Sequence, residues 1–171
     1  MIVLQKALPN DLPLIWEIIQ QAIRSRKEEG STQWQDGYPN LNTIATDIAQ
    51  QYGYVVLHNL EIIGYVAVIF DVEPAYEILE GHWLSQKGTP YMVVHRMAIS
   101  IRAKGKGFAH QILQKAEILA KQRGVNSIKI DTNFDNYAML KVLEKAKYTY
   151  CGTVYFRGTP RMAFEKLLMT D

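Results

Sequence analysis

Residues 97–110 of this chain of 171 residues, MAISIRAKGKGFAH, combine the features that indicate its fold. An apolar run typical of a strand precedes it, and apolar residues at helical spacing follow it. Gly105 and Gly107 therefore stand between a strand and a helix. The first amides of a helix have no partner within it, glycine allows close approach, and the helix dipole favours negative charge. Together with Lys104 and Lys106, this loop predicts a phosphate-binding site.

The charge distribution also favours an anionic ligand. Residues 81–116 contain no Asp or Glu and six Lys or Arg, whereas the remainder holds 13 basic against 17 acidic residues. A basic block inside an acidic domain indicates an anion held at one place, although a solvated basic loop is the alternative. Nucleic acid usually needs a broader basic face, so no nucleic-acid partner is expected.

The composition is that of a folded protein with one domain over residues 1–171. Hydrophobic residues make up 48%, charged residues 21%, and 18 residues are aromatic. The longest apolar run, residues 62–70, is too short for a membrane span, and no secretory leader is visible. The single cysteine, Cys151, is expected in the core and excludes an intrachain disulfide. A cytoplasmic protein without a membrane partner is expected.

The residue patterns predict an α/β fold with a mixed, mostly antiparallel sheet of about seven strands and flanking helices. Strands are expected at residues 2–8, 54–58, 62–71, 91–99, 127–131, 148–156 and 161–167. Helices are expected at residues 12–28 with Asp11 as cap, 43–51 with Asn42 as cap, 108–123 and 136–145. The order strand–helix–strand from 91 to 131 predicts a central parallel crossover, and short connections predict two hairpins.

Two well-known phosphate motifs do not fit the loop. The dinucleotide motif GxGxxG requires Gly or Ala where His110 stands, and the P-loop requires Ser or Thr where Gly107 stands. The loop instead resembles the [Q/R]xxGx[G/A] motif of the GNAT superfamily of acyl-CoA-dependent N-acyltransferases. The preferred register runs from Lys104 to Ala109, with Lys where the family has Gln or Arg. A second register, from Arg102 to Gly107, also fits.

Other segments extend the resemblance over the whole chain. The strand before the loop ends in Met97-Ala98-Ile99, similar to the family's Leu-Ala-Val. Residues 131–136 (DTNFDN) and 143–148 (LEKAKY) resemble the family's Asn-containing helix and its Tyr-Glu-Lys-Leu-Gly-Phe ending, and the order of elements matches. The segment QWQDGYP, residues 33–39, resembles a bacterial subgroup without an assigned substrate.

The resemblance implies acetyl-CoA as co-substrate and no metal. It implies a cleft between the strand that ends near Ile99 and the strand at 127–131. The backbone of Met97, Ala98 and Ile99 would pair with the pantetheine amides, and the Ile99 amide would polarise the thioester carbonyl. Asn136 would contact the cofactor from the opposite wall. The pyrophosphate would be held by Lys104, Gly105, Lys106, Gly107, Phe108, Ala109 and His110.

His95 is the candidate general base. Side chains alternate along a strand, which places His95 on the face that carries Met97 and Ile99. Several family members have a Glu or His base at this place, and histidine exchanges protons near neutral pH. A histidine that is hydrogen-bonded for structure is the alternative. The other histidines, His58, His82 and His110, show no metal-ligand spacing.

The acceptor is expected to be a small-molecule or peptide amine. Trp34, Asp36 and Tyr38 lie in the loop that covers the acceptor site in the family, and aromatic faces with a carboxylate suit a cationic amine. Packing of Trp34 and Tyr38 onto the domain is the alternative. The rival function is a non-catalytic acyl-CoA-binding module that acts through a protein partner. Dimers are common in the family, which leaves a homodimer open.

The family's acid for the departing thiolate, a Tyr, is replaced by Leu143, and its Gly before the aromatic residue is replaced by Lys147. Either water assists the thiolate, or a nearby residue such as Tyr137 or Tyr148 substitutes. These tyrosines and Tyr150 are otherwise packing residues. The missing acid favours the binding module, and an intact loop with His95 favours the enzyme.

Overall fold

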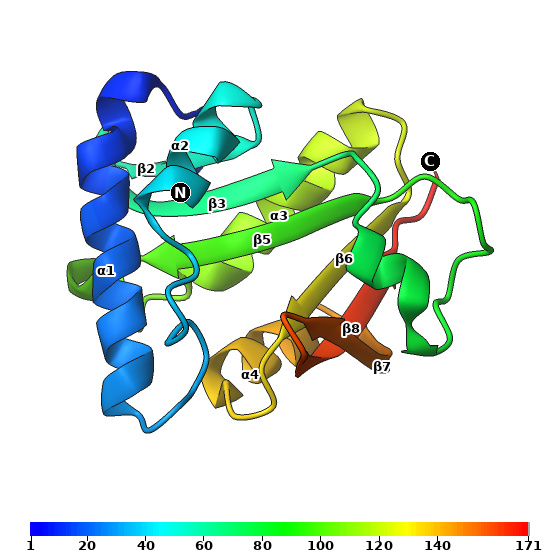
Figure 1. Ribbon diagram of the computed structural model, residues 1–171. Helices are drawn as coiled ribbons and strands as arrows, with labels where there is room; N and C mark the ends of the chain where they lie inside the picture. Colours follow the sequence, from blue (N-terminus) through cyan, green and yellow to red (C-terminus); the bar gives the residue numbers. More distant parts are fainter. Residues whose placement is uncertain (171) are drawn as a thin grey trace. The chain divides into compact units, whose positions relative to one another are not determined.

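The computed structural model describes residues 1–170, which contain four α-helices and eight strands (Figure 1). Residue 171, the last of the predicted domain, lies outside the described residues. The helices are α1 (Leu12–Glu28), α2 (Leu41–Ala49), α3 (Phe108–Gln122) and α4 (Tyr137–Lys145). The strands are β1 (Val3–Lys6), β2 (Gly53–His58), β3 (Glu61–Ile69), β4 (Glu80–Gly81), β5 (Met92–Ile99), β6 (Ser127–Thr132), β7 (Thr149–Phe156) and β8 (Thr159–Leu167). Three short 3₁₀ helices are η1 (Pro9–Asp11), η2 (Pro74–Ile78) and η3 (Ile101–Ala103).

Hydrogen bonds link the strands into a mixed sheet in the order β1-β2-β3-β5-β6-β8-β7-β4. The pairs β1–β2, β2–β3, β6–β8, β7–β8 and β4–β7 are antiparallel, and β5 pairs with β6 in parallel. The predicted α/β fold, its two hairpins and the parallel crossover through α3 are therefore confirmed. The sheet has eight strands rather than about seven, because β4 lies in the segment 72–90 that was expected to be a connection.

A pair of glycines explains why the sequence pattern did not predict β4. Gly81 in β4 pairs with Gly152 in β7, and both adopt φ near +144°. A Cβ on Gly81 would lie 2.1 Å from the Cys151 carbonyl oxygen, and one on Gly152 would lie 2.1 Å from that of Glu80. Only glycine permits this approach. A two-residue strand of this kind has no alternating pattern that a sequence could display.

Contacts divide the chain into two compact units. Unit 1 contains Met1–Val68 and Arg96–Ile112, and unit 2 contains Ile69–His95 and the chain from Leu113 onward. The border crosses β5 between His95 and Arg96, so the two halves of this strand belong to different units.

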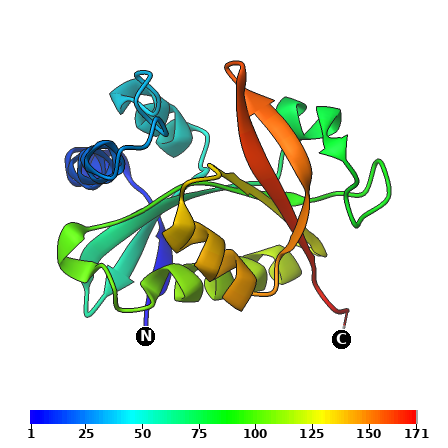
Figure 2. The same ribbon diagram turned by 90° about the horizontal axis from the view of Figure 1, so that it is seen from below.

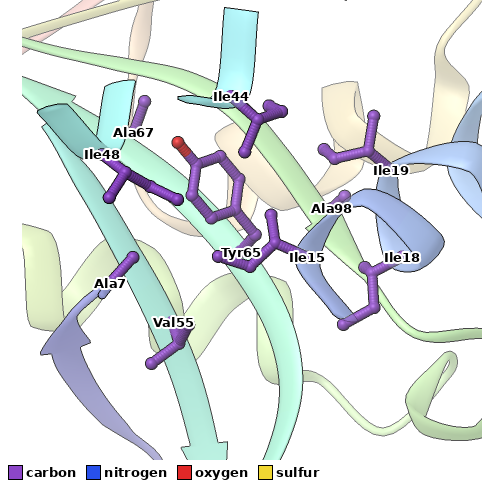
Figure 3. Close-up of a cluster of buried hydrophobic side chains, with 10 residues drawn as sticks. All are labelled: Ala7, Ile15, Ile18, Ile19, Ile44, Ile48, Val55, Tyr65, Ala67 and Ala98. Carbon is purple, nitrogen blue, oxygen red and sulfur yellow. The ribbon is translucent and has the colours of Figure 1, made fainter. Parts of the chain in front are cut away.

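In unit 1, α1 and α2 cover one face of strands β1 to β3 (Figures 1 and 2). Buried isoleucines of both helices pack on Tyr65 of β3, and Ala98 of β5 completes the cluster (Figure 3). Its members are Ala7, Ile15, Ile18, Ile19, Ile44, Ile48, Val55, Tyr65, Ala67 and Ala98. The helical spacing of the isoleucines in α1 is the pattern that predicted this helix.

One predicted helix cap is replaced by another residue, and the second stands at its predicted position without a capping hydrogen bond. Asn40, not Asn42, caps α2, because its Oδ1 accepts from the Thr43 amide at 2.9 Å, and α2 therefore begins at Leu41. Asp11 precedes α1, but its carboxylate accepts from the Leu8 amide at 2.8 Å and closes η1 instead of capping α1.

In unit 2, β6 and β7 flank β8, and Tyr76, Tyr91, Val93, Val154 and Ala163 form a buried cluster. Gly124, at φ +68°, ends α3 as predicted. Lys147 adopts φ +65°, so this lysine holds the left-handed conformation that glycine would favour at its position. No helix within residues 1–170 is both long and apolar enough to cross a membrane.

Candidate functional site

His95 has a carboxylate beside each of its ring nitrogens. Nε2 lies 3.2 Å from Oε2 of Glu73, and Nδ1 lies 3.7 Å from Oδ1 of Asp131. All three residues belong to unit 2, and the His95 side chain is 12% exposed. The candidate base therefore lies in an anionic setting that favours the approach of a cation.

Hydrogen bonds hold both carboxylates in place. Oε1 of Glu73 accepts from the Ala75 amide at 3.3 Å at the start of η2, and the Glu73 amide donates to the Tyr91 hydroxyl at 3.0 Å. The Tyr76 hydroxyl donates to Oδ1 of Asp131 at 2.5 Å. Burial raises the pKa of Tyr76, and the charge of Asp131 raises it further. Tyr76 is therefore a hydrogen-bond donor to Asp131 at neutral pH.

Aromatic rings pack against His95. The ring centroids of Tyr76 and Phe156 each lie 5.8 Å from that of the imidazole. Burial is also the main cause that raises the pKa of Tyr91, to about 12, with a contribution from its hydrogen bond to Glu77. Apolar surroundings strengthen electrostatic interactions, so both carboxylates act on His95 more strongly than they would in water.

The regular alternation of side chains that predicted the position of His95 is interrupted at Arg96. Arg96 adopts φ +51°, which is the left-handed region, and such a residue interrupts the regular alternation of a strand. His95 contacts Glu73 and Asp131 in unit 2, whereas Ala98 packs in the core of unit 1 (Figure 3). The placement of His95 rests on these contacts and not on alternation with Met97 and Ile99.

Arg96 forms a buried ion pair with Asp47 in unit 1. Its Nε donates to Oδ2 of Asp47 at 2.7 Å and its Nη2 to Oδ1 at 2.6 Å, while Nη1 donates to the Tyr38 hydroxyl at 2.6 Å. The Tyr65 hydroxyl donates to Oδ2 of Asp47 at 2.7 Å. Burial alone would lower the pKa of Arg96, but the hydrogen bonds and charge of Asp47, with Tyr38, outweigh it and raise the pKa.

Arg96 of this ion pair also helps to hold in place the loop that is expected to cover the acceptor. Tyr38 is half-buried and bonded to Arg96, and Trp34 packs against the core cluster of unit 1. Asp36 is exposed. Trp34 and Tyr38 therefore attach the loop to the domain, which agrees with the packing alternative, and their contact with an acceptor stays a prediction.

The glycine loop adopts the backbone that a phosphate site needs. Gly105 and Gly107 both have φ +76°, and α3 begins at the next residue, Phe108. Because left-handed φ favours glycine, the two positions that require glycine are 105 and 107. Both registers are compatible with this backbone, because Ala109 stands where the motif allows Gly or Ala and is the second residue of α3.

The lysines of the loop differ in their surroundings. Nζ of Lys104 donates to the hydroxyl of Ser25 in α1 at 2.9 Å, and the nearby Ile101 amide donates to Oε1 of Gln21 at 2.9 Å. Unit 1 contains Arg96, Arg102, Lys104 and Lys106 of the basic block, and Arg96 is neutralised by Asp47. The charges that remain beside the glycines are those of Arg102, Lys104 and Lys106.

Asn136 has a structural task at the start of α4. Its Oδ1 accepts from the Met139 amide at 3.2 Å, so it caps the helix, and its contact with a cofactor stays a prediction. Leu143, at the position of the family's acid, is fully buried in α4. Tyr137 is 69% exposed and Tyr150 is 53% exposed.

Tyr148 is buried, and its hydroxyl has no hydrogen-bond partner within residues 1–170. Burial raises its pKa, with a further contribution from Glu117, and Lys166 lies 5.7 Å from its ring centroid. An unsatisfied buried hydroxyl costs stability, by about 1–3 kcal/mol. We therefore expect Tyr148→Phe to keep or raise the melting temperature and to leave turnover unchanged. A large loss of turnover in this variant would instead make Tyr148 the acid for the thiolate.

No group of three or more His, Cys, Asp or Glu that could hold a metal is found in the described part of the chain. Cys151 is buried, as expected, and burial raises the pKa of its thiol. The His58 ring packs on Phe108 at 4.9 Å, beside the start of α3.

Sequence reasoning missed the groups that surround His95 and Arg96. Glu73 precedes His95 by 22 residues and Asp131 follows it by 36, and no local pattern connects them. Asp131 stands at the end of a predicted strand, which was the one available signal. Asp47 lies in the predicted helix of residues 43–51 and was not singled out, but it is 3% exposed.

Comparisons with known proteins agree with this fold. The model of the acetyltransferase (GNAT) family matches residues 16–148. A GNAT-family acetyltransferase from Streptococcus agalactiae 2603 has 34% identity and a TM-score of 0.90, covering 99% of this chain and 96% of its own. One from Listeria monocytogenes 4b F2365 has 20% identity and a TM-score of 0.77, covering 98% and 95%. A search of curated proteins found no match. The chain belongs to the GNAT family of acetyltransferases.

Proposed function

We propose that this protein is an N-acetyltransferase that transfers the acetyl group of acetyl-CoA directly to an amine. The observation that carries the proposal is the loop from Lys104 to His110, which passes through two left-handed glycines into α3 in a chain of the GNAT family. An aminoglycoside acetyltransferase with coenzyme A bound has the same fold, with a TM-score of 0.71 at 19% identity. The whole chain acts as one catalytic domain, and a cytoplasmic location is in keeping with this activity.

The loop suits the pyrophosphate of acetyl-CoA. The amides of the first turn of α3 have no partners within the helix, and the positive end of the helix dipole lies there. Arg102, Lys104 and Lys106 add positive charge, and Lys104 would exchange its bond to Ser25 for one to phosphate. The backbone of Met97 to Ile99 would pair with the pantetheine amides, and Asn136 would contact the cofactor.

His95 acts as general base in this proposal. An amine acceptor arrives mostly as an ammonium ion, because alkyl amines resemble lysine, whose pKa is near 10.4. His95 takes one proton from it, and the nitrogen lone pair then attacks the thioester carbonyl, whose oxygen is polarised by the Ile99 amide. The C–N bond forms, the C–S bond breaks, and a second proton from nitrogen reaches the thiolate through water. Cys151 has no role as nucleophile in this proposal, because it is buried and its thiol donates to the Thr149 carbonyl.

Thiol release over a panel of acceptors tests the proposal. The panel contains an alkyl primary amine, a polyamine, a peptide with a free N-terminus, and ribostamycin. Acetyl-CoA-dependent release of thiol with one or more of these amines is the expected result. Acetyl-CoA binding without release for any amine would favour the non-catalytic binding module.

Gly107→Glu tests the loop itself. A ligand that binds only the native state raises its melting temperature, so acetyl-CoA should stabilise the wild-type protein. A glutamate at 107 places a side chain and a like charge where the phosphate binds, and the acetyl-CoA shift should disappear. Gly124→Glu is the matched control, because Gly124 also has positive φ and open space around its Cβ position but lies at the far end of α3. An undiminished shift in the Gly107 variant would remove the loop from the proposal.

A further inference from the structure

The geometry around His95 points to more than a general base. We propose that Asp131 and Nδ1 of His95 together bind the acceptor as an ammonium ion, so that Asp131 selects amines over neutral nucleophiles. This inference rests on the proposed function and names the group that recognises its acceptor.

The tautomer of His95 follows from Glu73. An ionised carboxylate can only accept hydrogen bonds, so the contact of Oε2 with Nε2 at 3.2 Å requires a proton on Nε2. The neutral ring then carries its lone pair on Nδ1. Glu73 is itself held by the Ala75 amide and by the Tyr91 hydroxyl, so the ring is oriented by a fixed partner. Nδ1 is therefore the nitrogen that receives the proton.

The two carboxylate oxygens of Asp131 differ in their hydrogen bonds. Its Oδ1 accepts from the Tyr76 hydroxyl, whereas its Oδ2 has no hydrogen-bond partner within residues 1–170. The side chain is only 10% exposed. A carboxylate oxygen can only accept hydrogen bonds, so a ligand that brings an N–H can replace water at this oxygen.

The spacing fits a single nitrogen with two or more protons. Nδ1 and Oδ1 are 3.7 Å apart, too far for a hydrogen bond with each other. One donor nitrogen can lie about 2.9 Å from the imidazole nitrogen and from the carboxylate at the same time. A primary ammonium meets this requirement and brings a positive charge to a site with two carboxylates. An alcohol brings one O–H and no charge.

The proposed arrangement also balances charge during the reaction. The N–H bond of the ammonium breaks and its proton joins the Nδ1 lone pair, so the positive charge moves from the acceptor to the imidazolium. Glu73 and Asp131 face the ring on both sides and stabilise this charge in turn. The freed nitrogen lone pair forms the C–N bond, the C–S electrons leave with sulfur, and the second nitrogen proton goes to the thiolate. The neutral amide product no longer matches the carboxylates, which favours its release.

Asp131→Asn tests the proposal with little change in shape. Asn keeps an oxygen that accepts from Tyr76 but loses the charge. With an alkyl primary amine as acceptor, we expect KM for the amine to rise roughly 10–100-fold, as for the loss of a charged hydrogen bond. KM for acetyl-CoA should stay within about twofold of the wild-type value. The alcohol of the same carbon skeleton, used as an inhibitor, should bind the variant and the wild type equally.

Two further variants make the outcome decisive. Glu144→Gln removes the same charge from the exposed face of α4 and should change neither KM. Tyr76→Phe keeps the carboxylate but removes the hydroxyl that orients it, so KM for the amine should rise by a smaller factor. If Asp131→Asn shows no acetyl-CoA thermal shift, it is misfolded, and Tyr76→Phe decides.

The outcomes separate the two proposals. An unchanged KM for the amine in Asp131→Asn, with or without a loss of kcat, overturns the role of Asp131 in binding the acceptor. An unchanged KM in Tyr76→Phe does the same where the first variant is misfolded. The failure of the wild-type protein to acetylate any amine in the panel would instead overturn the proposed function.

Discussion

Replacing His95 with Gln is expected to lower kcat by roughly 10²–10⁴-fold, the range typical of a lost general base. Gln is close in size to His and can still hydrogen-bond to Glu73, but it cannot accept a proton at neutral pH. The variant should therefore bind acetyl-CoA with nearly the wild-type affinity, as measured by its thermal shift, while it releases thiol slowly.

The dependence of rate on pH provides a second measurement for this variant. In the wild-type enzyme, a protonated His95 cannot act as the base, so the rate should fall as the pH is lowered. This acidic limb should disappear in His95→Gln. His82→Gln is the control, because His82 is exposed and should change neither rate nor pH profile.

A full rate with an unchanged acidic limb in His95→Gln would mean that His95 is structural. The base would then have to be another group, and Asp36, exposed in the loop of residues 30–40, would be the next residue to replace.

Features that depend on neighbouring residues could be predicted from the sequence. The hairpin turn at Asn59 and Leu60 was predicted because a strand pattern breaks for only a few residues there, and both residues adopt positive φ. The end of α3 was predicted because a glycine directly follows an amphipathic run, and Gly124 indeed adopts positive φ. The cap of α2 was misplaced because Asn40 and Asn42 both precede the apolar positions, and only the hydrogen bond to Thr43 separates them.

The site was less predictable because its partners come from distant segments. His95 was singled out by its place on the strand before the glycine loop, yet its partners come from elsewhere: Glu73 lies just before η2 and Asp131 lies in β6. Arg96 gave no sign of its left-handed backbone, since arginine has no preference for that region. Its conformation is compensated by the ion pair with Asp47, a contact between β5 and α2 that no sequence pattern marks.

That ion pair leads to a second large effect: Asp47→Ala is expected to destabilise the protein by about 3–5 kcal/mol. The side chains of Asp47 and Arg96 are 5% and 10% exposed, so the loss of Asp47 leaves a buried guanidinium without its counter-ion. It also removes the acceptor of the Tyr65 hydroxyl in the centre of the unit 1 core (Figure 3). Urea unfolding at constant pH measures this change, with an unchanged slope as the sign that the unfolded state is comparable.

Two milder variants order the contributions within this network. Tyr65→Phe removes one hydrogen bond and leaves the ion pair intact, so it should cost about 0.5–1.5 kcal/mol. Asp47→Asn keeps an oxygen for Tyr65 and for one Arg96 nitrogen but removes the charge, and its cost should lie between those of the other two variants. Since Arg96 also bonds to Tyr38, Asp47→Ala should loosen the loop of residues 30–40, and faster proteolysis within this loop would show it.

A cost below about 1 kcal/mol for Asp47→Ala would mean that water solvates Arg96 as well as Asp47 does, because surface ion pairs contribute no more than this. The left-handed backbone of Arg96 would then need a cause other than the ion pair.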